Sequence, residues 1–242
     1  MSLARAALLL THANFHRRVF ISPNPNTPIE EYAKPSEKEI APLINMGIVI
    51  LRLSYSLVCV LEALVVVAFN LPKFPFSRAV LPILTSPNAT CAANLQPNTL
   101  FLVGLLFTLH GDLLRLWCFR ELGKHFTFVL TIQKDHKLIT SGPYAYLRHP
   151  SYLGAILGFM GEVLCHLTRG SWFMECAGSG MNGLILAALK GLFLARILTM
   201  APFCVVALKR AGEEDQILKH AFGKEWKEWE ERVPYRSIPG IY

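Results

Sequence analysis

Four long apolar stretches constrain what this chain can fold into more than any other feature of its sequence. A helix needs roughly 20 residues to cross the hydrocarbon core of a bilayer. Inside lipid, backbone polar groups must be satisfied within the segment, so such stretches form helices. Only 17% of the residues are charged and 52% are hydrophobic, which soluble domains rarely show. We therefore predict an all-α integral membrane protein with four or five transmembrane helices, and four spans at residues 43–69, 99–119, 151–167 and 184–208.

The chain before the first predicted span differs in character. Residues 1–10 carry an apolar run behind Arg5, and a polar stretch follows instead of a small-residue cleavage site. This favours a short interfacial or partly inserted helix over a signal peptide. The prolines of residues 22–42 indicate an extended linker. We divide the chain into residues 1–42 (short helix and linker), 43–98 (first span and lumenal loop) and 99–242 (membrane-embedded core).

The positive charges indicate how the spans are oriented. Basic residues concentrate in the loop at 120–150 and in the tail at 209–242, and they are sparse in the other two loops. Positive residues stay on the cytoplasmic side, so both basic segments are predicted to be cytosolic and the loop at 71–98 lumenal. That loop contains Asn88, in a glycosylation triplet. The net charge of +7 is explained by the membrane rather than by nucleic acid.

The cysteines give no sign of a metal site or of disulfide bonds. The six cysteines show no CxxC spacing, which argues against a zinc site or a disulfide framework and favours buried thiols. No metal is expected.

Three glycines of the third span, Gly154, Gly158 and Gly161, have the spacing of a helix-packing face. Glu162 and Arg196 lie inside spans, where they could pair or guide a substrate.

The C-terminal tail contains a predicted amphipathic helix. Apolar residues recur at helical spacing between residues 213 and 231, and Trp226 and Trp229 alternate with lysines and glutamates. Tryptophan and lysine together are typical of a membrane interface. Pro234 ends this helix soon after Arg232.

The most informative segment is the run at residues 138–154, just before the third predicted span. Pro150 can occupy the first turn of the following helix, where its missing N–H costs nothing. Arg148 and His149 then lie at the mouth of that helix, whose unpaired N–H groups suit a carboxylate. An interfacial anchor of tyrosine, arginine and histidine is the alternative interpretation of the same residues.

Two blocks of sequence resemble one known family. The run Ser-Gly-Pro-Tyr-Ala-Tyr-Leu-Arg-His-Pro-Ser-Tyr-Leu-Gly at 141–154 is similar to the signature of the isoprenylcysteine carboxyl methyltransferase family. The second block is Arg210, the acids at 213–215, and Phe-Gly-Lys-Glu-Trp-Lys-Glu-Trp-Glu-Glu-Arg-Val-Pro at 222–234. The resemblance covers roughly residues 100–242. Either block alone is shared with phospholipid methyltransferases and membrane sterol reductases.

The chain departs from the family pattern at several places. The loop at 168–183 is longer than expected, and Trp226 and Trp229 stand where tyrosine is usual. The acidic run Glu-Glu-Asp leaves open which acid matches the family's pair. The polar stretch at 12–18 weakens the usual first span. These departures concern the substrate more than the chemistry.

The resemblance implies an S-adenosylmethionine-dependent enzyme that methylates the C-terminal carboxylate of a farnesylated or geranylgeranylated cysteine in processed CaaX proteins. Its partners would be prenylated protein C-termini of small GTPase or pheromone type, at a multi-pass endoplasmic reticulum membrane with the site facing the cytosol. Arg210 and Glu214 would be catalytic, with Arg210 holding the carboxylate through its guanidinium fork. The cofactor would contact Gln133, Leu138, Gly142, Tyr144, Arg148, His149, Pro150, Tyr152, Glu213 and Asp215.

Methylation of a carboxylate would need no general base. The acceptor carboxylate has an ordinary pKa near ~3.5 and is already ionised at neutral pH. Catalysis then depends on positioning and partial desolvation. The alternatives are a phospholipid N-methyltransferase, for which the sequence offers no clear base, and behind it a sterol reductase, which should have more spans.

Overall fold

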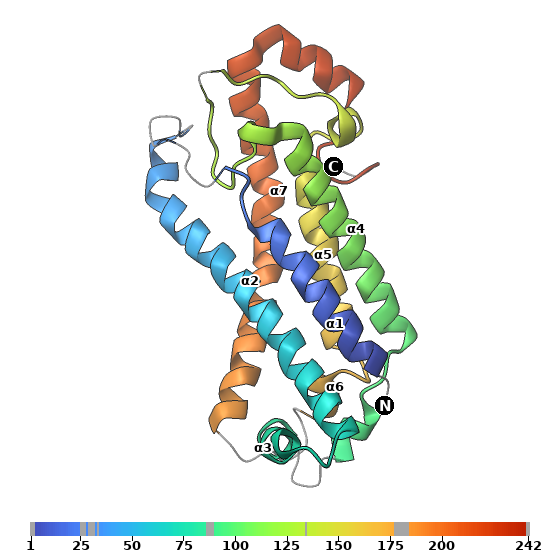
Figure 1. Cartoon of the computed structure of the whole chain (residues 1–242). Helices are drawn as coiled ribbons and strands as arrows, with labels where there is room; N and C mark the ends of the chain where they lie inside the picture. The colour runs from blue at the N-terminus through green and yellow to red at the C-terminus, as the bar shows by residue number, and fades with distance from the viewer. Residues whose placement is uncertain are drawn as a thin grey trace. The chain divides into compact units, whose positions relative to one another are not determined.

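The computed structural model describes residues 3–24, 28, 32, 34–85, 90–133, 135–176 and 184–240. Within these residues the chain is helical apart from loops and one isolated bridge between Tyr32 and Thr131. Figure 1 shows the longer helices, coloured along the chain. In order, the elements are α1 (Leu3–His16), η1 (Arg17–Phe20), α2 (Pro35–Asn70), α3 (Pro75–Leu84), η3 (Thr90–Asn94), α4 (Thr99–Leu122), η4 (Gly123–His125), η5 (Gly142–Ala145), α5 (Pro150–His166), α6 (Trp172–Glu175) and α7 (Leu184–Arg232).

Two of the described helices are long and apolar enough to cross a membrane, Pro35–Asn70 and Thr99–His125. They contain the first two predicted spans. Helix α2 begins at Pro35 rather than at residue 43, because proline is tolerated in the first turn. It also accommodates Pro42 in its interior. The other two predicted spans overlap α5 and the first part of α7, and their insertion in a membrane stays a prediction.

The chain folds into two compact units, each assembled from three separate segments. The first unit comprises residues 1–18, 51–109 and 158–200. The second comprises residues 19–50, 110–157 and 201–242. Every residue that the sequence predicted to bind cofactor or substrate belongs to the second unit. Asn88, the acceptor of the predicted glycosylation triplet, lies outside the described residues.

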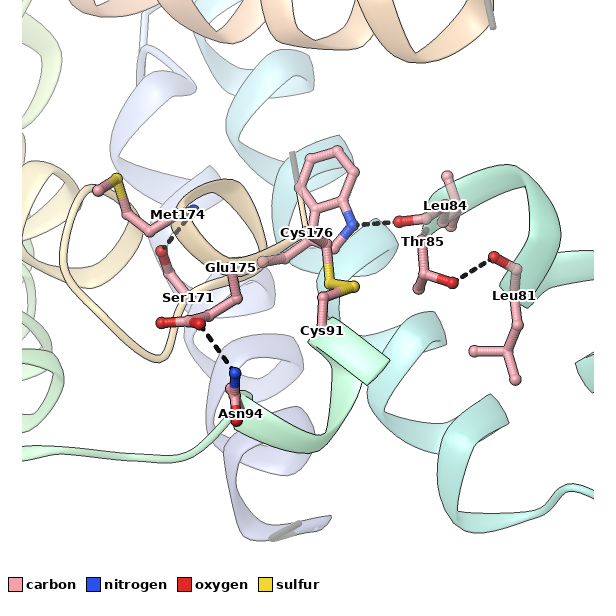
Figure 2. Close-up of a disulfide and its surroundings, with 10 residues drawn as sticks. Leu81, Leu84, Thr85, Cys91, Asn94, Ser171, Met174, Glu175 and Cys176 are labelled. Atoms are coloured by element: carbon pink, nitrogen blue, oxygen red, sulfur yellow. Dashed lines mark hydrogen bonds between the residues drawn. A yellow bond between two sulfur atoms is a disulfide. The ribbon is translucent and has the colours of Figure 1, made fainter. Parts of the chain in front are cut away.

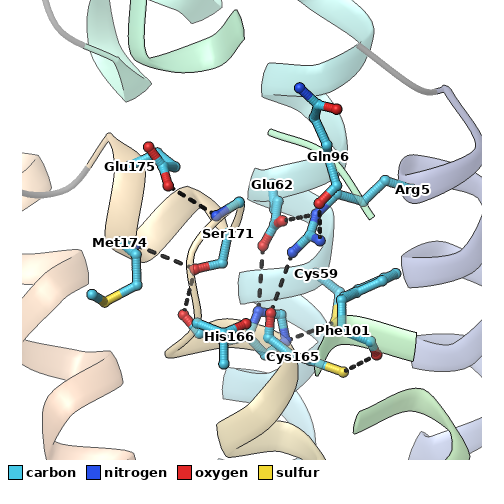
Figure 3. Close-up of polar contacts among 12 residues, drawn as sticks. Arg5, Cys59, Glu62, Gln96, Phe101, Cys165, His166, Ser171, Met174 and Glu175 are labelled. Atoms are coloured by element: carbon cyan, nitrogen blue, oxygen red, sulfur yellow. Dashed lines mark hydrogen bonds and ion pairs between the residues drawn. The ribbon is translucent and has the colours of Figure 1, made fainter. Parts of the chain in front are cut away.

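The first unit has a buried polar network that includes α1. The Arg5 side chain, fully buried, donates to Glu62 at 2.5 Å and to the backbone carbonyls of Gln96 and Cys165. Glu62 also contacts His166 Nδ1 at 3.3 Å, as Figure 3 shows. A buried charge is tolerated only when it is paired and hydrogen-bonded, and these contacts meet that condition. Helix α1 is therefore an integral part of this unit rather than only an interfacial segment.

The two charges predicted inside the spans pair with each other. Arg196 Nε donates to Glu162 Oε2 at 3.0 Å and its Nη2 donates to Oε1 at 2.8 Å, which is a bidentate arrangement. Arg196 also donates to the hydroxyl of Ser54 at 2.7 Å, and His16 contacts Glu162 at 3.1 Å. Both members of the pair are buried. Of the two roles predicted for them, the structure shows the pairing.

A disulfide joins Cys91 and Cys176, which corrects the expectation that all six cysteines are thiols. The bond links η3 to the end of α6 across 85 positions of sequence (Figure 2). Asn94 donates to Glu175 at 3.2 Å beside it, and the Trp172 indole donates to the carbonyl of Leu84 at 2.7 Å. The pairing was missed because spacing in sequence cannot show which loops meet in space. The remaining four cysteines are thiols.

Small residues bring α4 and α5 together, as the glycine spacing predicted. In the first unit, a side chain on Gly161 would collide with the backbone of Gly104. In the second unit, a Cβ atom on Gly154 would lie 2.7 Å from the carbonyl oxygen of Gly111. Such contacts are typical of helix pairs in membranes. Gly158 has more room, since its nearest neighbour would be His16 at 3.8 Å.

The last helix is bent near its end. Gly223 has φ 51° and ψ −110°, which interrupts the helical backbone of α7. Residues with a Cβ rarely adopt a positive φ, so glycine suits this bend. Trp226 and Trp229 follow it and are buried in a cluster with Tyr144, Cys118 and Val233. The tryptophans therefore pack inside the second unit instead of facing a membrane interface.

Candidate active site

The segment at 138–154 folds into a short 3₁₀ turn, η5, followed by the start of α5. Gly142 opens the turn with φ +57°, and a Cβ atom there would lie 2.6 Å from the Glu121 side chain. Ser141 donates to Glu121 at 3.0 Å. The positive φ therefore favours glycine at this position, and a larger residue would also displace the Glu121 side chain. Pro150 begins α5 as predicted, which leaves Arg148 and His149 at the mouth of the helix.

The C-terminal segment holds this mouth through the backbone. The backbone N–H of Arg148 donates to the carbonyl of Tyr235 at 3.1 Å, and that of His149 donates to Arg236 at 2.6 Å. The Arg148 side chain donates to the carbonyl of Val233 at 3.1 Å. With their backbone N–H groups paired in this way, Arg148 and His149 are held next to the segment that follows α7.

Asp215 is the centre of the polar cluster. Its Oδ1 atom lies 2.8 Å from His149 Nε2, and its Oδ2 atom accepts from Arg148 at 3.1 Å and from Arg236 at 2.8 Å. The side chain is only 1% exposed. Burial alone would raise the pKa of this carboxyl, but His149 and the two arginines lower it below its ordinary value. Asp215 is therefore a buried, ionised group that orients three basic side chains.

Glu214 approaches the same histidine from the other ring nitrogen. Its Oε2 atom lies 3.3 Å from His149 Nδ1 and accepts from the Tyr152 hydroxyl at 3.2 Å. Burial lowers the pKa of His149, but the carboxylates of Glu214 and Asp215 outweigh this effect and raise it to about 9. His149 is then a cation at neutral pH with both N–H groups donated to carboxylates. Glu214 remains about one third exposed, so it can also meet a ligand.

Arg210 lies on α7 one turn before these acids. Its Nη2 atom donates to Glu37 at 3.0 Å and approaches the carbonyl of Phe128 at 3.4 Å. The Tyr152 hydroxyl lies close enough to the same guanidinium for the two groups to interact electrostatically. Arg210 thus joins the cluster through Tyr152, which also binds Glu214.

The other predicted residues lie in different surroundings. Gln133 contacts His125 at 2.9 Å and donates to the carbonyl of Lys124 at 3.0 Å. Glu213 is exposed and pairs with Lys34 at 2.8 Å. Leu138 packs in the apolar cluster around Tyr144, whose backbone carbonyl accepts from Trp229 at 3.0 Å. The structure thus brings together Arg148, His149, Tyr152, Arg210, Glu214 and Asp215, and gives Gln133 and Glu213 other partners.

Two buried donors remain for a ligand. Arg148 Nε and Trp226 Nε1 have no hydrogen-bond partner among the described residues. The Arg148 guanidinium lies over the Trp226 ring, 5.6 Å from its centroid. A buried donor without a partner is costly, so such atoms indicate a place for an acceptor. Lys219 Nζ also lies over the Trp226 ring, 5.4 Å from its centroid, so the partly exposed Glu214 carboxylate is the group left for a cationic ligand.

Sequence reasoning missed Glu37 and Arg236. Both occupy segments without a motif: Glu37 follows the Pro-rich linker, and Arg236 lies beyond the proline that ends the last helix. Glu37 is only 3% exposed. A charged residue is almost never fully buried unless it is paired. The pairing, however, was not visible in the sequence.

Comparisons with known proteins agree with the resemblance of the first sequence block, at 141–154. Residues 102–189 match the Isoprenylcysteine carboxyl methyltransferase (ICMT) family. The "Protein-S-isoprenylcysteine O-methyltransferase" of Homo sapiens is 32% identical over 150 residues, which cover 57% of this chain and 41% of that protein. The protein of the same name from Xenopus laevis is 27% identical with the same coverage. "Protein-S-isoprenylcysteine O-methyltransferase B" of Arabidopsis thaliana is 28% identical over 133 residues, 54% of this chain and 55% of that protein.

The chain spans about two fifths of the length of the vertebrate relatives it matches. The matched family region contains Arg148, His149 and Tyr152, while Arg210 and the acids of α7 lie beyond it. The resemblance predicted from the sequence motifs is therefore confirmed: residues 102–189 of this chain are similar to the isoprenylcysteine carboxyl methyltransferases.

Proposed function

We propose that this protein methylates the C-terminal carboxylate of a prenylated cysteine, with S-adenosylmethionine as the methyl donor. The observation that carries the proposal is the convergence of Arg148, His149 and Tyr152 with Arg210 and Glu214 in one unit. The matched family and the names of the relatives favour a carboxylate acceptor over the phospholipid and sterol alternatives.

The residues present fit the proposed cofactor. Arg148 Nε and Trp226 Nε1 are buried donors available to acceptor atoms, and Glu214 is a carboxylate available to a cationic group. When bound, S-adenosylmethionine would supply an electrophilic methyl group on a positively charged sulfur. Asp215 keeps Arg148 and His149 in fixed orientations, and such preorganisation lowers the cost of reaching the reactive geometry.

Arg210 is the proposed anchor for the acceptor. A guanidinium binds a carboxylate through charge-assisted N–H donors in a fixed plane, so it sets the orientation of the carboxylate as well as neutralising its charge. The acceptor is ionised at neutral pH, so no group has to remove a proton from it. Tyr152 links Arg210 to Glu214, and thereby connects the acceptor side to the cofactor side. Glu214 acts in this proposal by holding Tyr152 and His149.

The proposed setting is a multi-pass protein of the endoplasmic reticulum membrane with the site facing the cytosol. The prenyl tail partitions into lipid while the charged cofactor arrives from water, so an interfacial site can meet both. The Cys91–Cys176 disulfide supports this orientation, because its loops are those predicted to be lumenal and disulfides persist in oxidising compartments. The substrates would be processed CaaX proteins of small GTPase or pheromone type.

The purified protein should transfer tritium from labelled S-adenosylmethionine to a farnesylcysteine analogue. Mild alkali hydrolyses a carboxyl methyl ester and releases labelled methanol, whereas an N-methyl group on a lipid amine is retained. We expect alkali-labile label with the prenylcysteine acceptor and none with phosphatidylethanolamine vesicles. Label that enters only the lipid and resists alkali would overturn the proposed acceptor.

A further inference from the structure

The first turn of α2 and the residue just before it contact the site segment of α7 through two ion pairs. Glu37 meets Arg210 at 3.0 Å, and Lys34 meets Glu213 at 2.8 Å. The two pairs differ in environment, since Glu37 and Arg210 have 4% and 18% of their side chains exposed, against 41% and 56% for Lys34 and Glu213. An exposed pair contributes little because water screens it, whereas a buried carboxylate binds its partner strongly.

Glu37 is itself held in place from a second direction. The backbone N–H of Leu130 donates to Glu37 Oε2 at 3.0 Å, and the same oxygen accepts from Arg210. A carboxylate that accepts a backbone N–H and a guanidinium together has little freedom to rotate. The loop carbonyl of Phe128 lies 3.4 Å from the same Arg210 nitrogen. The loop around 128–130 and Glu37 thus form a rigid support for one nitrogen of Arg210.

This support determines which part of the guanidinium is available. Both contacts fall on Nη2, so a ligand would meet Arg210 through Nη1 or Nε, which lie on different edges of the guanidinium. A guanidinium has five donors in a fixed plane, so anchoring one nitrogen sets the direction of the others. Without Glu37, the nearby carboxylate of Glu214 would compete for Arg210.

We infer that Glu37 is a positioning residue that orients Arg210 to receive the substrate carboxylate. The inference rests on the proposed function for the identity of the substrate, but the Glu37–Arg210 contact does not. Loss of Glu37 should weaken binding of a carboxylate acceptor and leave cofactor binding largely intact, because the partners of Arg148, His149 and Asp215 within the described part of the chain do not include Glu37.

Three variants test this inference in the full chain. Glu37→Ala removes the carboxylate and should raise the KM for a farnesylcysteine analogue by roughly tenfold or more. Glu37→Gln retains an oxygen that can accept from both Leu130 and Arg210, so it should recover most of the affinity. Lys34→Ala, the matched control, removes the exposed ion pair on the same turn and should change little. Cofactor affinity is measured by calorimetry in all three.

A second readout does not depend on the substrate. Phenylglyoxal modifies arginine, and peptide mass spectrometry gives the rate at Arg210. Labelling should be faster in Glu37→Ala than in wild type, and close to wild type in Glu37→Gln and Lys34→Ala. If wild-type protein fails to methylate the analogue but this pattern holds, the proposed function fails and the positioning role stands.

Three results would reject the positioning role of Glu37. An unchanged acceptor KM in Glu37→Ala, together with unchanged labelling of Arg210, would overturn the inference. Equal losses in Glu37→Ala and Lys34→Ala would show a general clasp between two segments rather than positioning of Arg210. A loss in Glu37→Ala that persists at full size in an Arg210→Ala background would likewise reject it, because the effect must act through Arg210.

Discussion

The Nε2 atom of His149 lies 2.8 Å from Oδ1 of Asp215, and this contact joins the start of α5 to α7 inside the second unit. Glu214 approaches the other ring nitrogen at 3.3 Å. The imidazole is therefore enclosed by two carboxylates on different ring edges. The electrostatic state of His149 follows from this arrangement and leads to the first prediction.

The stability of the protein should decrease as pH rises through the titration of His149. The pKa of His149 is raised from 6.5 to about 9, so the folded state binds this proton more tightly than the unfolded chain. That contribution is complete below pH 6.5 and is lost as pH rises through about 9. Thermal unfolding in detergent should show a falling midpoint over this window.

Asp215→Asn provides the comparison for this pH dependence. Removing one carboxylate should lower the pKa of His149, so the fall in stability moves to lower pH and becomes smaller. Lys224→Ala, an exposed residue of the same unit, should retain the wild-type profile. Identical pH profiles for wild type and Asp215→Asn would contradict the assigned pairing.

Replacement of His149 should weaken cofactor binding. His149→Ala leaves Glu214 and Asp215 without their shared cation, so Glu214 and Arg148 lose the orientation in which they would meet the cofactor. Loss of one charge-assisted contact to the cofactor costs on the order of 1.5–3 kcal/mol, or roughly ten- to a hundredfold in affinity. Calorimetry in detergent measures the change, and His149→Gln, which keeps one donor, should lie between wild type and alanine. Equal affinities in all three proteins would remove His149 from the cofactor site.

Arg210 should distinguish a carboxylate acceptor from an amine. Arg210→Lys keeps the charge but loses the planar fork, so it should be impaired, and Arg210→Ala more so. The carboxylate is ionised across neutral pH, so its ionisation should not limit the rate, whereas an amine would react faster as pH rises. Initial rates with a farnesylcysteine analogue over roughly pH 6–9 check both points. Full activity in both variants would eliminate the carboxylate-holding role.

The disulfide predicts a countable chemical result. Of the six cysteines, Cys91 and Cys176 are joined and four are thiols. Alkylation of unfolded protein should therefore modify four cysteines without reductant and six with it. In Cys91→Ser, all five remaining cysteines should react without reductant, and the stability should fall by about 2–4 kcal/mol. Six alkylated cysteines in unreduced wild-type protein would show that the bond is absent.

The Glu162–Arg196 pair should be more costly to break than to replace. Glu162→Gln leaves a buried guanidinium without its carboxylate, which typically costs about 3–5 kcal/mol. A double variant, Glu162→Leu with Arg196→Met, removes both charges and should be destabilised less than the single variant. Resistance to unfolding in mixed detergent micelles measures the difference. A double variant less stable than Glu162→Gln would indicate a further role for these charges.

Local sequence determined much of the framework. The apolar stretches predict α2 and α4 because backbone groups inside lipid must be satisfied within their own segment, although the start of α2 at Pro35 was not anticipated. The run at 138–154 specified the helix start at Pro150 and hence the position of Arg148 and His149. Proline and glycine act through their own backbone geometry, so their effects can be predicted from the chain alone.

Tertiary structure alone decided which side chains meet. Glu213, Glu214 and Asp215 are adjacent in sequence, yet one pairs with exposed Lys34, one is shared between His149 and Tyr152, and one is buried among three basic groups. Successive residues of a helix point about 100° apart, so the docking of α7 separates their roles. The contact of Glu37 with Arg210 spans 173 positions of sequence. A local sequence pattern cannot predict such a contact, because it forms only when the two segments pack together in the folded chain.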